Sequence, residues 1–424
     1  MANGFNKEEI VMFDEMLAGF DDALVVSKLA TVYQTDQTTM ERTNDVIWRP
    51  QPYIMTSFDG LDQSANFGDV VQLAVPASIN TFKSSNWTLT ANELRDALQE
   101  GRIRDGAKQR LSSDINISAN LVASNLGSIV SKRTTPATGF DDVSQLDSLF
   151  NEQGVPMDDR FVAYNSRQYN QMAGDLAKRQ TMAGRPETAY GRALVGKDIA
   201  GFDVFKMDYS NRLTAAAGVT VTMNGANQRY VPVATVASPN GGRVNVDNRF
   251  QTITIGVVSG TVKIGDAFTI AGVNSVHHIT KQDTGQLKTF RITGILTGAG
   301  GAGTVQITPP IIAADSTPTA GEVQYKNVTA TPANGAGLTF LNTVTAAVNP
   351  FWRKDALQIL PGRIAYPTDA GMMVMRGTTD QGFELVMVKQ ADIKTGKVFY
   401  RVDTKYGVNM MNTEMAGVQL FDQV

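Results

Sequence analysis

The stretch that decides the fold is residues 90–131, TANELRDALQEGRIRDGAKQRLSSDINISANLVASNLGSIVS. Thr90 and Glu93 have the spacing of a capping box, which predicts that a helix starts here. Apolar residues then recur in steps of three and four, which keeps one narrow stripe on one side of a helix. The stripe consists of Ala107, Leu111, Ile115, Ala119, Val122, Leu126 and Ile129. The other side carries residues that suit solvent or a polar neighbour: Lys108, Arg110, Asp114, Asn116, Asn120 and Asn125.

No proline interrupts this stretch, so the pattern predicts a rod of about 40 residues and roughly 60 Å. Gly101 and Gly106 each weaken a helix by about 1 kcal/mol relative to alanine. A bend or break between these two glycines is therefore an open alternative. A plain long helix lying across a sheet is another, although such a rod is longer than a compact core needs.

The composition of the chain excludes several classes of protein and of functional site. The chain has 424 residues, enough for about two to three domains, and its 42% hydrophobic and 19% charged residues are typical of a folded protein. A net charge of -3 argues against a mainly electrostatic nucleic-acid binder. The absence of cysteine excludes disulfides, thiolate metal sites and cysteine nucleophiles. The polar start, Met1–Glu9, is unlike a signal peptide, and the Gly-, Thr- and Pro-rich stretch Ile292–Ala314 is unlike a membrane span.

Two elements are predicted before the long helix. Asn6–Ala30 reads as an amphipathic helix that packs on its own body or on a neighbouring chain, with one apolar face of Ile10, Phe13, Leu17, Phe20 and Leu24. Asp45–Tyr53 and Val70–Val75 predict the strands of a hairpin, and Thr56–Gly68 predicts its polar, extended tip. Isolated hairpins are marginal in water, so this one needs a partner surface.

After Pro136 the pattern is mixed. Helices are predicted over Val143–Asn151 and Ser166–Arg179, and strands over Arg160–Asn165, Gly201–Met207 and, late in the chain, Lys397–Val408. Gly218–Leu338 almost lacks helix signals and alternates with period two, as in Phe250–Val258 and Phe290–Leu296. That pattern is typical of a small antiparallel barrel or sandwich, with Ala330–Gly337 as a hinge. The simplest account is a β-domain inserted into an α/β domain.

Three motifs could carry chemistry, and none has the required context. Gly298-x-Gly300-x-x-Gly303 matches a dinucleotide fingerprint, but a strand ending at proline follows it where a helix should start. Gly191-x-x-x-x-Gly196-Lys197 resembles a phosphate-binding loop, but Asp198 stands where Ser or Thr should hold magnesium. The only histidines, His277 and His278, are adjacent, so on a strand they point to opposite faces and cannot readily share a metal.

Charged residues point to contacts instead. Arg102, Arg104, Lys108 and Arg110 alternate with Glu100 and Asp105, which indicates a solvated or intersubunit ion-pair face and not a nucleic-acid groove. We therefore predict no enzyme, no catalytic residue, no cofactor and no metal site. The candidates for intersubunit contact are Asp59, Asp62, Asp69, Arg102, Arg243, Asp247 and Arg249.

Several stretches, in this order along the chain, resemble one family. They are Met40-x-Arg42 with Ile47-Trp48-x-Pro50, Leu89-x-Ala91-x-x-Leu94-Arg95-Asp96, Asp175-Leu176-x-Lys178-Arg179, Pro186-Glu187-x-Ala189-Tyr190, Ala200-Gly201-Phe202-Asp203, 244–250, Ala271-Gly272-Val273, Phe351-Trp352 and Tyr406-Gly407-Val408-Asn409. Together they resemble the major coat protein of short-tailed bacteriophages that infect enteric bacteria, and more widely the capsid fold of tailed phages.

This resemblance implies an α+β capsid fold with a long spine helix, an extended hairpin loop, an axial domain and an inserted antiparallel β-barrel. The implied parts are an N-terminal helical arm (1–35), the hairpin loop (36–85), a peripheral domain with the spine helix (86–135), the axial domain (136–217), the inserted barrel (218–338), and the second axial part with the peripheral return strands (339–424). The hairpin is expected to lie across the neighbouring subunit. A loop near 238–243 is expected to bridge capsomers, although Arg243 is its one strong charge.

The resemblance also implies function and partners. The chain is expected to form hexamers and pentamers of itself in an icosahedral shell of the virion, assembled in the host cytoplasm as a procapsid that later expands. Scaffolding protein, portal protein and non-specifically packaged double-stranded DNA are the implied partners, with no membrane. Three alternatives stay open: a protein-cargo compartment of the same fold, a nucleotide-binding enzyme using Gly298–Gly303, and a β-rich adhesin module.

Overall fold

The computed structural model describes residues 5, 7–33, 46–52, 54–55, 57, 59–64, 67–90, 93, 97–178, 198–207, 209–216, 218–315, 317–366, 372–392 and 394–424. The chain divides into two compact units. The first comprises Met1–Ile47, Ala77–Asn120 and Leu357–Asn409, and the second comprises Trp48–Pro76, Leu121–Ala356 and Met410–Val424. The family-like stretches at 40–42, 94–96 and 186–190, and residue 179, lie outside the described residues.

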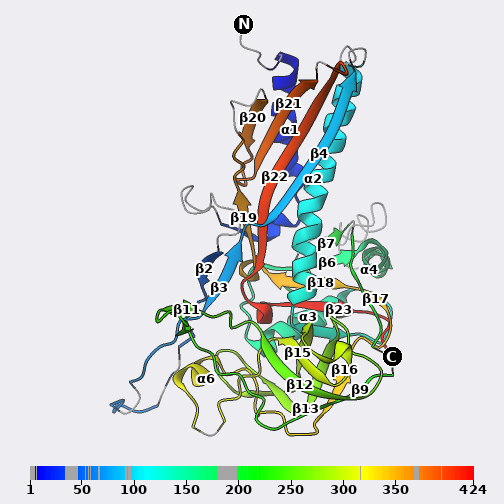
Figure 1. Ribbon diagram of the computed structural model, residues 1–424. Helices are drawn as coiled ribbons and strands as arrows, with labels where there is room; N and C mark the ends of the chain where they lie inside the picture. The colour runs from blue at the N-terminus through cyan, green and yellow to red at the C-terminus, as the bar shows by residue number, and fades with distance from the viewer. Residues whose placement is uncertain are drawn as a thin grey trace. The chain divides into compact units, whose positions relative to one another are not determined.

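The first unit is built on a sheet in which β1, β19, β22, β21 and β20 lie in that order and β4 pairs with β22 (Figure 1). The strands are β1 Thr31–Val32, β4 Thr81–Thr90, β19 Leu357–Gly362, β20 Met373–Thr378, β21 Glu384–Asp392 and β22 Lys397–Met410. β22 is central and pairs antiparallel with β4, from Lys397 opposite Thr90 to Tyr406 opposite Thr81. The predicted late strand is thus confirmed, and it continues two residues beyond Val408.

The long helix α2 runs without a break from Ala97 to Leu126, through Gly101 and Gly106. The alternative of a break is therefore wrong. Leu111 and Ile115 are fully buried, and burying such a side chain is worth about 1.5–3 kcal/mol, more than each glycine costs. The predicted stripe is buried from Ala107 to Ala119, after which Ala123 takes the place expected for Val122. Asn120, predicted to be on the polar side, is also buried.

The predicted start of this helix is only partly described. The backbone N–H and the hydroxyl of Thr90 both donate to the Glu93 carboxylate, at 2.8 and 2.9 Å. Thr90 is, however, the last residue of β4, and the helix is described only from Ala97. The capping-box pair therefore closes the turn that follows a strand.

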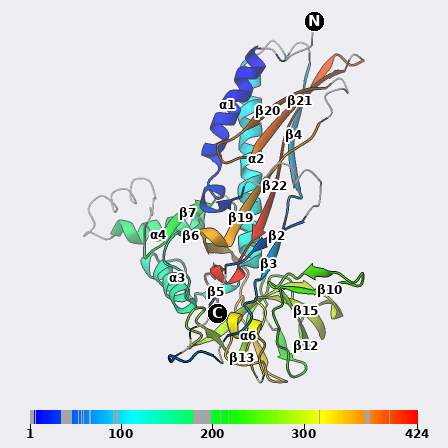
Figure 2. The same cartoon turned by 90° about the vertical axis from the view of Figure 1, so that its left-hand side faces the viewer.

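Helix α1, Lys7–Ala23, lies alongside α2 and precedes the short helix η1, Ser27–Leu29 (Figure 2). Phe13 and Phe20 are buried as predicted, and Phe13 fills the space beside Gly377 on β20. The amphipathic helix was predicted to pack on its own body or on a neighbouring chain, and α1 packs on its own unit. Ile10 is 41% exposed, because the buried place on that turn belongs to Glu9, whose carboxylate is paired inside the unit.

The second unit contains a sheet in the order β5-β23-β18-β6-β7. Its elements are β5 Ile129–Lys132, α3 Phe140–Gln153, β6 Arg160–Asn165, α4 Ser166–Lys178, β7 Asp203–Met207, β18 Asn349–Arg353, η4 Lys354–Ala356, η5 Thr413–Met415 and β23 Ala416–Leu420. Phe150 of α3 and Met172 of α4 share a core with Phe351 of β18. The helices and strands predicted between 143 and 207 are confirmed within the described residues.

The inserted segment is a closed barrel in the order β12-β15-β14-β13-β16-β9. Its elements are β9 Thr220–Met223, β12 Gln251–Ser259, β13 Ala267–Val276, β14 Asp283–Ile295, η3 Gly298–Gly300, β15 Gly303–Thr308, α6 Ala320–Tyr325 and β16 Gly337–Phe340, with a hairpin of β10 Thr235–Ala237 and β11 Arg243–Asn245 outside it. The barrel is filled by apolar side chains such as Phe268, Phe290 and Ile307. The chain enters and leaves it through β8 Arg212–Leu213 and β17 Ala346–Ala347, which pair. A barrel, and not a sandwich, is therefore present.

The predicted hairpin forms at its base only. β2, Val46–Pro50, pairs with β3, Ala74–Ser78, so the second strand begins four residues later than predicted. The reason is that the N–H of Val71 donates to the Gln324 side chain and its carbonyl accepts from the Tyr325 hydroxyl. Side chains of α6 thus satisfy backbone groups that a strand ladder would have used. We call residues 48–76 the ribbon.

Candidate assembly surfaces

The ribbon has a packed base and an uncovered tip. Leu73 is buried in a cluster with Ile312 and Tyr325 of the same unit. Further out, Leu61 is fully exposed and Phe67 is 88% exposed. Large apolar side chains gathered on one exposed segment mark an interaction surface. The ribbon base therefore folds onto its own unit, while the tip presents apolar side chains.

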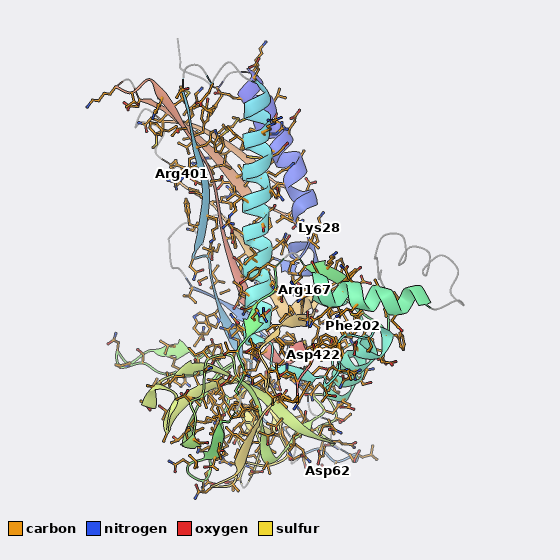
Figure 3. All side chains as sticks on the ribbon, turned by 90° about the vertical axis from the view of Figure 1, so that its right-hand side faces the viewer. Lys28, Asp62, Arg167, Phe202, Arg401 and Asp422 are labelled. Carbon is orange, nitrogen blue, oxygen red and sulfur yellow. The ribbon has the colours of Figure 1, made fainter. Side chains whose placement is uncertain are left out.

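The same tip is acidic. Three predicted contact residues, Asp59, Asp62 and Asp69, are all exposed on it, and the label of Asp62 marks its position in Figure 3. No lysine or arginine occurs between Arg49 and Lys83. The Ser64 backbone N–H donates to Asp62 Oδ1 at 3.0 Å, which holds the pKa of that carboxyl below its usual value. The tip therefore stays negatively charged at neutral pH.

A second candidate surface is the hairpin of β10 and β11. Within the part of the chain that the structure describes, the two strands pair only with each other, and Val236 and Val244 are both exposed. Arg243, a predicted contact residue, is exposed and donates from Nε to the Thr235 hydroxyl at 2.7 Å. A free two-stranded hairpin is marginal in water, so this one gains stability when another surface covers it.

Asp247 and Arg249, also predicted contact residues, follow β11 closely in the chain and pair with each other. Arg249 Nη2 is 2.7 Å from Asp247 Oδ2, and Arg249 Nη1 donates to the Met410 carbonyl at 2.7 Å. Both side chains are partly buried. The structure brings these two together, and the backbone of Asp247 forms an isolated parallel β-bridge with Ala74 of the ribbon.

Arg102, the last predicted contact residue, is exposed on α2 in the first unit. Its neighbours are engaged within the unit: Arg104 pairs with Glu15 of α1, and Arg110 lies 3.2 Å from Asp114. A cavity of about 360 Å³ between α1 and α2 is lined by Val11, Glu15, Gly101 and Arg104. The alternating charges of α2 therefore serve partly to hold α1.

Two buried polar groups in the second unit escaped prediction. Lys288 Nζ contacts Glu414 Oε1 at 2.5 Å, and Arg291, fully buried, donates to the carbonyls of Ser124 and Gly127 at the end of α2. Burial lowers the pKa of Arg291 to about 10, against the attraction of Asp266. Both cations lie on β14, but the predicted alternation over Phe290–Leu296 includes only Arg291 and carries no signal for its burial, and Lys288 precedes that run.

Of the motifs that could carry chemistry, the glycine motif at 298–303 lies at a turn. Gly298–Gly300 forms η3, and the strand β15 follows from Gly303 to Thr308, as predicted for a turn and not for a nucleotide site. The prediction that His277 and His278 lie on a strand is wrong, because β13 ends at Val276 and the His277 N–H donates to the Gln282 carbonyl. The stretch Gly191–Lys197 lies outside the described residues.

The described residues lack both a metal-binding cluster and a membrane-spanning helix. They contain no group of three or more histidine, aspartate or glutamate side chains that could hold a metal ion. In that same part of the chain, no helix is long and apolar enough to cross a membrane.

Comparison with known proteins finds a family model and several solved structures that are similar to this chain. A family model described as P22 coat protein, gene protein 5, matches residues 1–422. Solved structures that are more distantly similar include the capsid of cyanophage P-SCSP1u, at 10% identity over 94% of this chain and 88% of that one, with a TM-score of 0.44. The CUS-3 coat protein I-domain is 38% identical over 30% of this chain and 98% of its own, with a TM-score of 0.23. The virus-like particle of Pyrococcus furiosus is 8% identical over 96% of both chains, with a TM-score of 0.39.

Proposed function

Because the chain belongs to the P22 coat protein family, we propose how its surfaces build a shell. As a member of that family it is a major capsid protein: a structural subunit, not an enzyme, of the icosahedral shell of a phage virion. The proposal is that the exposed ribbon tip provides a main contact between copies. The observation that carries it is the exposure of Leu61 and Phe67 on a segment whose base is already packed.

We assign the parts as the family resemblance implies. Residues 1–35 form an arm, 36–85 the hairpin loop, 86–135 the peripheral domain, 136–217 and 339–424 the axial domain with the return strands, and 218–338 the inserted barrel. The closed barrel and the unbroken α2 support this division. The barrel strand β16 ends at Phe340, two residues past the assigned boundary.

Four acidic or basic residues are proposed as contacts at the ribbon and the hairpin. Asp59, Asp62 and Asp69 would meet donors on the neighbouring copy, and Arg243 would meet an acceptor across capsomers. Arg102 is proposed as a further contact on α2. Asp247 and Arg249 would act as a pair that supports the hairpin preceding them in the chain, since each already bonds the other.

The partners are proposed on the resemblance. Hexamers and pentamers of this chain would first assemble with a scaffolding protein and a portal as a procapsid in the host cytoplasm, and the shell would then expand around double-stranded DNA. A net charge of -3 suits a container that holds DNA without gripping it. Repeated contacts under closed symmetry give a stable shell even where each contact is weak.

The experiment compares assembly of the full chain with that of a variant carrying Leu61→Ser and Phe67→Ser. We expect the variant to remain folded by circular dichroism and to form few or no particles in negative-stain micrographs. The matched control is Val258→Ser, which removes an exposed apolar side chain from the barrel strand β12. If the ribbon variant yields as many particles as the parent chain, the proposed contact is refuted.

A further inference from the structure

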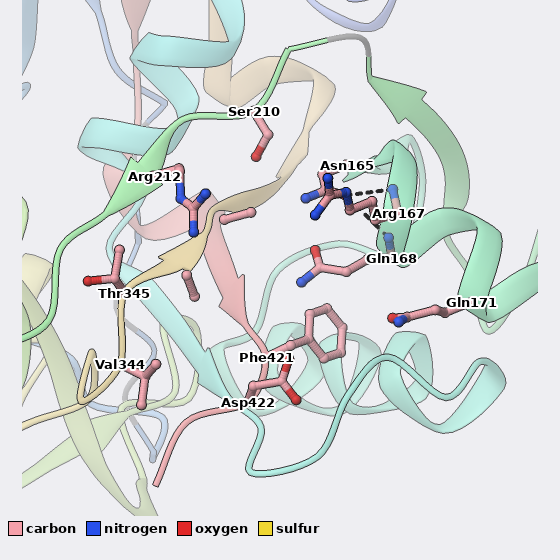
Figure 4. A pocket seen from close by; sticks show the side chains of 12 residues that line it. Asn165, Arg167, Gln168, Gln171, Ser210, Arg212, Val344, Thr345, Phe421 and Asp422 are labelled. Atoms are coloured by element: carbon pink, nitrogen blue, oxygen red, sulfur yellow. Dashed lines mark hydrogen bonds between the residues drawn. The ribbon is translucent and has the colours of Figure 1, made fainter.

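A cavity of about 430 Å³, lined by both polar and apolar side chains, lies in the second unit, beside the beginning of α4 (Figure 4). Arg167, Gln168 and Gln171 of α4 line one side of it, and Arg212 of β8 lines another. Its remaining wall includes the ring of Phe421. None of the assembly surfaces described above includes these residues, so the cavity has no assigned role.

The two arginine side chains that line this cavity form no ion pair with another described residue. Within the described part of the chain, neither the Arg167 nor the Arg212 guanidinium pairs with a carboxylate or donates a hydrogen bond. Most other arginines in the same unit are engaged: Arg160 with Asp147 at 2.5 Å, for example, and Arg353 with Asp158 at 2.9 Å. Asp422 also lines the cavity but lies beyond ion-pair distance of both guanidinium groups. Two like charges sharing one concave site favour a bound anion.

The local backbone fixes this arrangement. Asn165 Oδ1 accepts from the N–H groups of Arg167 at 2.7 Å and Gln168 at 3.2 Å, which caps the first turn of α4. The positive end of the helix dipole therefore lies at the same place as the arginines. The Gln168 side-chain oxygen is buried and has no partner among the described residues. Because the oxygen and nitrogen of an amide are assigned and not observed, this amide can be turned so that its NH2 group donates to an anion in the cavity.

We propose that the cavity binds a phosphate group between Arg167 and Arg212. Each guanidinium presents a planar fork of N–H donors, and the amides of Gln168 and Gln171 add more. A carboxylate has only two oxygens to receive them, whereas a phosphate has up to four and accepts two forks at once. The chemical class is therefore phosphate, held either as the free ion or as part of a nucleic-acid backbone.

The test is isothermal titration calorimetry on the purified full-length chain at constant ionic strength. The probes are inorganic phosphate, acetate and a short duplex DNA. The variants are Arg167→Gln and Arg212→Gln, whose side chains are exposed enough to leave the core intact. The matched control is Arg243→Gln, which makes the same change of charge on the β10–β11 hairpin.

Saturable phosphate binding that each cavity variant weakens by about tenfold or more, and the control does not, is the expected result. If only the duplex shows this arginine dependence, the phosphate site is upheld and its source is the nucleic-acid backbone. Binding that is unchanged in both cavity variants overturns the proposal, as does acetate binding as tightly as phosphate. The proposal is also overturned if neither inorganic phosphate nor the duplex binds saturably.

Discussion

Lys288 Nζ lies 2.5 Å from Glu414 Oε1, with the two side chains 3% and 18% exposed. Lys288 sits on the barrel strand β14, and Glu414 sits in η5, just before the sheet strand β23. The Gln153 side chain at the end of α3 accepts from the same ammonium at 3.1 Å, and Asn327 donates to the same carboxylate at 3.2 Å. This cluster joins the inserted barrel to the α/β part of the second unit through charged groups.

Removing one charge of this pair leaves the other buried. Glu414→Ala should lower the free energy of unfolding by about 3 kcal/mol, because Lys288 then loses its counter-ion in a low-dielectric site. Urea unfolding of the unassembled chain measures this. Adding Lys288→Met should restore much of the loss. The control Asp158→Ala, at the exposed end of the pair with Arg353, should cost clearly less, because water screens that charge. Equal losses in the two single variants would contradict the assignment.

Acid should weaken the same region through His278. Burial is the main cause that lowers the pKa of His278 to about 4 from 6.5, against the attraction of Glu414; Lys281, Lys288 and His277 lower it further. The unfolded chain therefore binds more protons between these pH values, so stability falls as the pH drops from about 6.5 towards 4, by at most about 3 kcal/mol.

Urea unfolding at a series of pH values tests this, with His278→Gln as the comparison. The variant should show a flatter decline over that range, because glutamine does not titrate. A parallel decline in both chains would show that other groups carry the acid sensitivity.

The buried Glu9 should hold α1 in place. Its carboxylate accepts from Lys389 Nζ at 2.5 Å and from the Tyr400 hydroxyl at 2.7 Å. Glu9→Ala should therefore expose α1 to limited proteolysis and lower the free energy of unfolding by about 2–3 kcal/mol. The exposed neighbour Glu8 provides the control, since Glu8→Ala should leave the digestion pattern unchanged. Similar patterns for the two variants would count against this role.

Two substitutions of Gly106, to alanine and to proline, should change the stability of the chain in opposite directions. A Cβ added here meets no described atom within 4 Å, so Gly106→Ala should stabilise the chain by about 1 kcal/mol. Gly106→Pro should destabilise α2 by about 3 kcal/mol or more and block particle formation. Thermal unfolding and electron microscopy measure the two effects. Normal particles from the proline variant would show that assembly does not need a continuous α2.

Periodic elements could be predicted because their burial repeats in the sequence. The stripe of Leu111, Ile115 and Ala119 and the alternation of β12 and β22 each depend on one face meeting one core. Similarly, the turn at Gly298–Gly303 follows from the strand residues after it.

Positions that depend on a distant partner could not be predicted. Glu9 takes the buried position in place of Ile10 only because its carboxylate accepts hydrogen bonds from Lys389 and Tyr400. These two residues lie 380 and 391 residues further along the chain. The late start of β3 depends on Gln324 and Tyr325 binding the backbone of Val71. Of the candidate contacts, the exposure of Asp59, Asp62 and Asp69 agrees with a polar tip, whereas Arg249 is partly buried because its guanidinium also donates to the distant Met410 carbonyl.

The central claim is that the ribbon tip contacts another copy of the chain, and site-directed cross-linking tests it most directly. The chain has no cysteine, so Leu61→Cys provides a single thiol for a photoreactive label. In assembled particles, we predict that light produces adducts between two chains, and that the labelled peptide is joined to a peptide of the neighbouring copy. Adducts confined to single chains within intact particles would contradict the account.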